Sequence, residues 1–158
     1  MQFTNVFLAT AYFFFSVTPM VANAQCNPGD FGGRRMALYN SQIGRVIGPK
    51  WPALWRIRED RPGYVLENAD DNNDLVLTRN GSTLEMAPFS PDSAFLQHFG
   101  VTCNDCEAGS ATGCTISTTG LNPHCVSVFS LRPTDMNVQE CIPGANSQTF
   151  EFEEAGDE

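Results

Sequence analysis

The sequence has no stretch, outside its first 24 residues, in which apolar residues recur at the helical period of about 3.6 residues. We therefore expect little helix in the rest of the chain. Apolar residues alternate instead with polar ones over short runs, as at Leu75 and Leu77 and at Phe99 and Val101. A period of 2 is typical of half-buried strands, so these runs favour an all-β fold.

Basic residues are also scarce. The chain holds nine Lys and Arg residues against 18 Asp and Glu residues, which gives a formal net charge of −9. Nucleic-acid binding requires clustered basic side chains that neutralise phosphates, so we exclude nucleic acid as a partner. The negative charge favours a soluble protein that meets cationic partners or a mildly acidic exterior.

Recognisable catalytic motifs are missing. The sequence contains no Gly-x-Ser-x-Gly elbow, and it has only two histidines. His98 lies next to Phe99 in an expected strand, and His124 follows Pro123 at an expected turn. A secreted nuclease with two catalytic histidines is the alternative, and these two positions do not favour it. We predict a protein that is not an enzyme and that needs no cofactor.

The cysteines lack the partners of a zinc or redox site. Cys103-x-x-Cys106 is the only CxxC pair, and no histidine follows at ligand spacing. An even number of cysteines in a secreted chain favours disulfides over metal ligands. We therefore expect disulfide bonds and no metal. The six cysteines are Cys26, Cys103, Cys106, Cys114, Cys125 and Cys141.

The first 24 residues resemble a secretory signal peptide. An apolar run from Val6 to Val17 precedes the small-residue tripeptide Ala22-Asn23-Ala24, and cleavage there would make Gln25 the mature N-terminus. An uncleaved membrane anchor is the alternative, because no Lys or Arg precedes the run. We predict a signal peptide at 1–24, one domain at 25–154 and an acidic tail at 155–158. The mature protein is expected to be secreted, extracellular, monomeric and free of the membrane.

The stretch from 64 to 101 predicts four short strands around one strong turn. They are expected at Tyr64–Glu67, Asp74–Thr78, Thr83–Ala87 and Leu96–Val101. Asn80-Gly81 lies between the second and third, and both residues tolerate positive φ in a hairpin turn. Similar units precede and follow, and they close at Ala53–Trp55, Gln97–Phe99 and Gln148–Phe150. Three units of this size need to share one core.

The Gln-x-aromatic closings resemble the QxW motif of ricin-B-type lectins, which have the β-trefoil fold. The resemblance implies twelve strands around a pseudo-threefold axis, with Trp55, Phe99 and Phe150 in the core and the glutamines bracing turns. It also implies a disulfide between Cys125 and Cys141, which occupy the second and third strands of the last unit. The remaining four cysteines can pair in three ways, which the sequence leaves open.

The resemblance places a sugar-binding Asp on the second strand of a unit. This chain has Ser127, Val76 and Ala37 at those positions, so another contact is needed. Trp51, with Lys50 beside it, lies between two prolines that stiffen the loop, and we expect its ring to stack on a ligand. A packed position, in which Trp51 folds back to cap the barrel, is the alternative.

Trefoils of plant Kunitz-type and fungal families also inhibit proteases through loops, and they need no catalytic residues. Here the loop Arg56–Pro62 occupies the reactive-loop position, and Arg58 could enter a trypsin-like pocket. Arg61 suits that role poorly because Pro62 follows it. A solvated charged turn is the alternative interpretation.

Two further motifs concern surface loops. The acidic run Glu67–Asp74 lacks the glycine and terminal Glu of a calcium-binding EF-hand loop, so we interpret it as a polar hairpin connection. Asn80-Gly81-Ser82 is an acceptor for N-glycosylation at a hairpin tip.

Together these observations predict a secreted, non-catalytic recognition protein, lectin-like or effector-like, that binds an extracellular glycan or glycoprotein through loops. The alternative function is inhibition of a secreted protease or another hydrolase.

Overall fold

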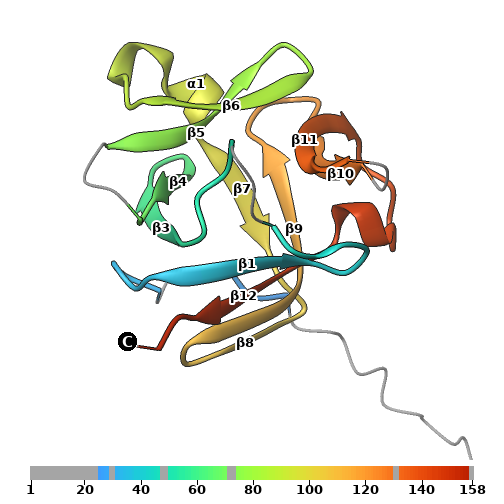
Figure 1. Ribbon diagram of the computed structural model, residues 1–158. Helices are drawn as coiled ribbons and strands as arrows, with labels where there is room; N and C mark the ends of the chain where they lie inside the picture. Colours follow the sequence, from blue (N-terminus) through green and yellow to red (C-terminus); the bar gives the residue numbers. More distant parts are fainter. Residues whose placement is uncertain (1–24, 29–30, 47–49, 71–73, 130–131, 157–158) are drawn as a thin grey trace, which may run out of the picture.

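The computed structural model describes residues 25–28, 31–46, 50–70, 74–129 and 132–156 (Figure 1). The predicted signal peptide, residues 1–24, lies outside the described residues. The described part of the chain is all-β, with one α-helical turn and three disulfides. Its strands are β1 (Met36–Asn40), β2 (Gly44–Arg45), β3 (Trp55–Asp60), β4 (Gly63–Asn68), β5 (Leu75–Asn80), β6 (Thr83–Pro88), β7 (Phe99–Thr102), β8 (Asp105–Glu107), β9 (Ser110–Thr118), β10 (His124–Phe129), β11 (Arg132–Glu140) and β12 (Phe150–Glu154).

Nine antiparallel strands form a closed barrel. Their order is β10, β11, β6, β5, β4, β3, β1, β12 and β9, and the ring closes where Cys125 of β10 pairs with Ser117 of β9. Three strands lie outside this ring: β2 pairs with β1, β8 pairs with β9, and β7 bridges β4 and β9. Figure 1 shows β5 and β6 at one end of the molecule and β1, β12 and β8 at the other.

The ring corrects the β-trefoil expectation. Three equal units would contribute equally to the barrel, but the three sequence units place two, three and four strands in it. The first unit contributes least among the described strands. Its expected strand Arg45–Ile47 lies partly outside the described residues, and the described part gives only β2 (Gly44–Arg45), which pairs with β1. The sequence similarity between the units therefore does not extend to a threefold arrangement of strands.

The repeated motif is a local brace for a turn. Gln97 is buried, its Oε1 accepts a hydrogen bond from Ser90 N at 2.8 Å, and its Nε2 donates to Pro88 O at 2.9 Å. The first unit has Ala53 at this position, and Ala53 N donates instead to the Asp70 carboxylate. The amide brace is thus absent from the first unit, and its presence elsewhere does not define the fold.

A helical turn replaces part of one expected strand. The strand predicted at Leu96–Val101 starts only at Phe99, as β7. Its first two residues, Leu96 and Gln97, end α1 (Ala94–Gln97), which follows η1 (Pro91–Ser93). Pro91 favours the start of η1 because its fixed φ suits the first helical position. No helix among the described residues is long and apolar enough to span a membrane.

Large apolar side chains fill the barrel. Trp55, Phe99 and Phe150 are each fully buried, as the sequence predicted for these three aromatics. Phe152 packs beside them and contacts Phe31, with 6.2 Å between the ring centroids. Burial of each aromatic ring stabilises the fold by roughly 1.5–3 kcal/mol relative to an exposed ring.

The hairpin predicted at Asn80-Gly81 is confirmed. Asn80 pairs with Thr83, which leaves Gly81 and Ser82 as the turn, and Gly81 has φ +65°. Glycine adopts positive φ without the steric cost that a Cβ brings. Asn80 is exposed at this tip, where its Nδ2 lies 3.3 Å from Glu85 Oε1.

The disulfides resolve the pairing that the sequence left open. Cys26 bonds to Cys106 and Cys103 bonds to Cys114. The first bond ties the first described residues to β8, and the second ties the residue after β7 to β9. Cys125 bonds to Cys141, the pair that the resemblance implied, and joins β10 to the end of β11.

Candidate functional site

Trp51, the expected aromatic platform, lies in the core. Its side chain is only 5% exposed and belongs to the cluster of buried residues inside the barrel. A stacking platform needs an accessible ring face. The structure therefore corrects the platform prediction and favours its alternative, in which Trp51 packs against the barrel. Neighbouring Lys50 is exposed and lies 3.5 Å from Asp135.

Arg58 lies in a strand and not in a loop. Strand β3 extends to Asp60 and β4 begins at Gly63, which shortens the expected reactive loop to a tight turn. The Arg58 guanidinium contacts Glu67 at 2.7 Å and Asp60 at 3.1 Å, and it lies 5.3 Å from the centre of the Phe89 ring. The hydrogen bond to Glu67 raises the pKa of Arg58 further above its ordinary value. This charge is engaged within the protein, unlike that of a loop residue presented to a protease.

The polar run Glu67–Asp74 holds no metal site in its described part. Glu67 pairs with Arg58, and the Asp70 carboxylate accepts hydrogen bonds from Ala53 N and Leu54 N. Asp71, Asn72 and Asn73 lie outside the described residues. Elsewhere in the described chain, no three His, Cys, Asp or Glu side chains gather as metal ligands.

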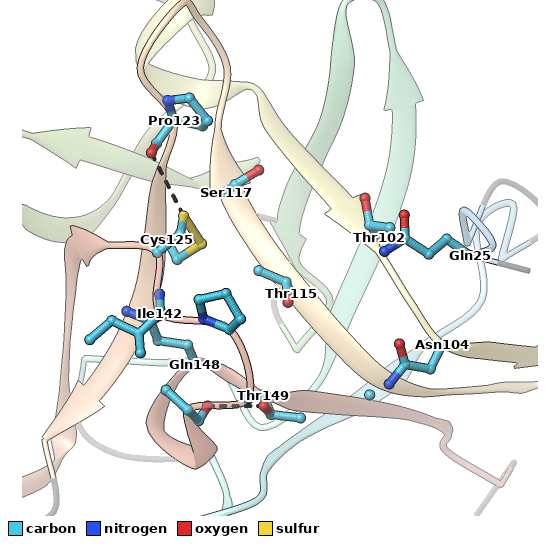
Figure 2. A pocket seen from close by; sticks show the side chains of 15 residues that line it. Gln25, Thr102, Asn104, Thr115, Ser117, Pro123, Cys125, Ile142, Gln148 and Thr149 are labelled. Atoms are coloured by element: carbon cyan, nitrogen blue, oxygen red, sulfur yellow. Dashed lines mark hydrogen bonds between the residues drawn. A yellow bond between two sulfur atoms is a disulfide. The ribbon is translucent and has the colours of Figure 1, made fainter. Parts of the chain in front are cut away.

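A hollow of about 520 Å³ lies between one face of β7 and β9 and the segment after β11 (Figure 2). Its volume falls within the range of small-ligand sites, roughly 300–1,000 Å³. We call its two sides the shelf and the wall. The shelf consists of Thr102, Asn104, Gly113, Thr115 and Ser117, and the wall consists of Ile142, Pro143, Gly144 and Ala145. Gln25 and Pro123 lie at its edges.

Strand alternation positions the shelf. In β9, Cys114 and Ile116 point into the core, so Thr115 and Ser117 between and after them face outward. Thr102 of β7 pairs directly with Thr115, which brings their side chains together on the same face. Two adjacent strands thus present a row of short hydroxyl side chains.

Two glycines make space for polar side chains of the shelf. A Cβ added at Gly100 would lie 2.9 Å from Ser117 Oγ, and one added at Gly113 would lie 2.3 Å from Asn104 Nδ2. Both positions therefore leave room for the neighbouring polar side chain. Gly113 also has φ +61°, which other residues rarely adopt.

Buried amides hold the wall in place. Gln148 Oε1 accepts a hydrogen bond from Ile142 N, and its Nε2 donates to Glu140 O, both at 2.8 Å. Asn40, only 1% exposed, donates from Nδ2 to the carbonyls of Ser147 and Thr149 at 3.2 and 3.0 Å. The Cys125–Cys141 disulfide fixes the start of the same segment. The wall is therefore braced at both ends.

None of the described side chains around the hollow carries a formal charge, although the chain has a net charge of −9. The shelf offers hydroxyls and an amide, and the wall offers the side chain of Ile142, which is 59% exposed. Such a surface can form hydrogen bonds on one side and apolar contacts on the other.

Sequence reasoning did not find this hollow. The alternation of Thr115 and Ser117 with core residues was visible, but it is equally typical of any solvated strand. The site arises only because residues 141–149 fold back beside β9. Of the predicted contacts, Trp51, Lys50 and Arg58 all lie outside the hollow.

Comparison with known proteins provides no family for the chain. No family model matches it, so the expected kinship with ricin-B-type lectins has no support. No curated protein matches it either.

Proposed function

We propose that this protein is an extracellular, non-catalytic recognition protein that binds a glycan or glycoprotein in the hollow between β9 and the Ile142–Ala145 wall. The observation that carries the proposal is the charge-free shelf of hydroxyl and amide side chains opposite a braced apolar wall. Ligand sites commonly combine apolar walls with a few convergent polar groups. Three disulfides are consistent with an oxidising, extracellular environment.

Preorganisation supports binding at this place. The wall is held by the Gln148 and Asn40 amides and by a disulfide, and the shelf is part of the barrel sheet. A ligand that enters such a site does not have to order loops, which saves conformational entropy on binding. Because no aromatic ring lines the hollow, we expect modest affinity at a single site.

Binding of the mature protein, residues 25–158, to a glycan array tests the proposal. Thr115→Trp would fill the middle of the hollow and should abolish binding without unfolding the protein. Thr112→Trp is the matched control, because Thr112 is exposed on the same strand but lies outside the hollow. Thermal melts of both variants verify the fold. Equal binding by the wild type and the Thr115 variant would refute the site.

Protease inhibition is not favoured by any comparable observation. Its expected contact, Arg58, is engaged by Glu67 and Asp60. A panel of secreted proteases assayed beside the array is the direct check on that alternative.

A further inference from the structure

We infer that the hollow selects an uncharged sugar and binds it without a metal ion, an inference that rests on the proposed function. No Lys, Arg or His is found among the described residues that line the hollow. Signal cleavage would add one cation at its edge, the α-amino group of Gln25, and this charge is lost when the terminal glutamine cyclises to pyroglutamate, the form that this inference concerns. A carboxylate or sulfate group would therefore lose its hydration there without gaining a cationic partner, which is unfavourable. The net charge of the protein, −9, adds a longer-range repulsion against anions.

The shelf matches the hydrogen-bonding chemistry of neutral sugars. Each hydroxyl of Thr102, Thr115 and Ser117 can donate one hydrogen bond and accept others, and a sugar hydroxyl has the same capacity. Within the described chain, no residue forms a hydrogen bond with the side chains of these three residues or of Asn104. Their polar atoms are thus available to a ligand.

The wall suits the other side of a sugar ring. A pyranose carries its hydroxyls around the ring edge and exposes C–H groups on its faces. Ile142 is 59% exposed and stands beside Pro143, so an aliphatic surface lies opposite the hydroxyl row. A ring placed against the wall would bury its C–H face on aliphatic side chains and direct its hydroxyls to Thr115 and Thr102, which Figure 2 shows on the other side of the hollow from the segment of Ile142.

Metal-assisted sugar binding does not fit this site. Calcium is coordinated by oxygen ligands, among which Asp and Glu carboxylates predominate. The hollow is lined by no Asp or Glu in the described chain, and the described residues form no metal-binding cluster elsewhere. The sugar must therefore be held by direct hydrogen bonds and apolar contacts.

The experiment compares neutral oligosaccharides with sialylated, sulfated and uronic-acid oligosaccharides of matched length, with and without EDTA. Wild-type protein should bind members of the neutral set only, and EDTA should leave that binding unchanged. Thr115→Val removes one shelf hydroxyl at nearly constant volume and should weaken binding about tenfold, the effect of losing roughly one neutral hydrogen bond. Thr112→Val is the control and should bind like the wild type.

Charge reversal provides a second test. Thr115→Lys places a cation on the shelf and should transfer preference from neutral to acidic oligosaccharides, whereas Thr112→Lys should not. Wild-type preference for acidic sugars, or loss of binding in EDTA, would overturn this inference while leaving the hollow as the ligand site. If Thr115→Trp has no effect on any bound ligand, the proposed function itself fails. The two failures are therefore distinguishable.

Discussion

The buried amide of Gln148 shows how a single side chain can stabilise a turn of this protein. Gln148 is 3% exposed and satisfies both Ile142 N and Glu140 O. Buried backbone N–H and C=O groups need hydrogen-bond partners, and here the side-chain amide takes the place of a neighbouring strand. The Gln-x-aromatic motif is thus explained by a turn that needs a donor and an acceptor beside a core aromatic ring.

Gln148→Ala should lower the free energy of unfolding by about 1–3 kcal/mol, because Ile142 N and Glu140 O would lose their partner. Gln42→Ala is the matched control, since Gln42 is exposed, and it should change stability by less than about 0.5 kcal/mol. Urea denaturation of both variants measures the difference. Equal midpoints would mean that water replaces the amide without cost.

Trp51→Ala should destabilise the protein by roughly 3–5 kcal/mol, the usual cost of removing a large buried aromatic side chain. The reason is its 5% exposure within the core cluster. Lys50→Ala, at the exposed neighbouring residue, should leave the melting temperature nearly unchanged. If Trp51→Ala instead melts like the wild type, the indole is accessible and its role as a ligand platform returns.

At the scale of single elements, the strand pattern was largely predictable and the helical turn was not. Alternation in Leu75–Leu77 and in Leu84–Met86 identified β5 and β6, and Asn80-Gly81 located the turn between them. These signals are local. Leu96 and Gln97, the last two residues of α1, were expected as strand because the same short apolar segment fits either period, and the hydrogen bond from Gln97 to Thr78 of β5 favours the helical turn.

The disulfide between Cys125 and Cys141 connects two elements and one side of the hollow. Its removal by the double change to Ala should cost about 2–4 kcal/mol, because the crosslink restricts the unfolded chain between residues 16 apart. Melting of the double variant gives the stability, and a non-reduced peptide map verifies the pairing beforehand. A fragment that links either cysteine to Cys103 or Cys106 would contradict the assignment.

The variant without the Cys125–Cys141 disulfide also tests whether the wall must be held in place for glycan binding. Without the disulfide, the Ile142–Ala145 segment keeps its Gln148 brace but loses its covalent attachment to β10. Glycan affinity should then fall even at temperatures where the barrel remains folded, because the segment has to be ordered on binding. Unchanged affinity would show that the amide brace alone is sufficient.

The architecture of the whole molecule was the least predictable level. Short alternating patterns predicted the β class, whereas the resemblance to ricin-B-type lectins implied the buried aromatics and one disulfide. The sequence did not predict that β2 lies outside the ring of nine strands or that residues 141–149 lie over one face of β9. Both depend on contacts between segments far apart in the chain, and the residues that make them are ordinary polar and small side chains.

Closure of the barrel depends on its last strand. β12 (Phe150–Glu154) pairs with β1 on one side and with β9 on the other, and it places Phe150 and Phe152 in the core. β12 is the only direct link between β1 and β9 in the ring order. Its loss would leave β1 and part of β9 each without a partner strand and would open the core, which favours aggregation.

Truncation after Thr149 should therefore abolish cooperative folding, whereas truncation after Ala155 should not. The second variant retains β12 and the hydrogen bond from Ala155 N to Arg35 O at 2.8 Å. Its stability should remain within about 0.5 kcal/mol of the full chain, since the one described residue that it lacks, Gly156, is exposed. Circular dichroism melts and binding of a hydrophobic dye measure both. If the shorter protein still melts cooperatively, the remaining strands close without β12 and the barrel does not require the pairing that joins its two ends.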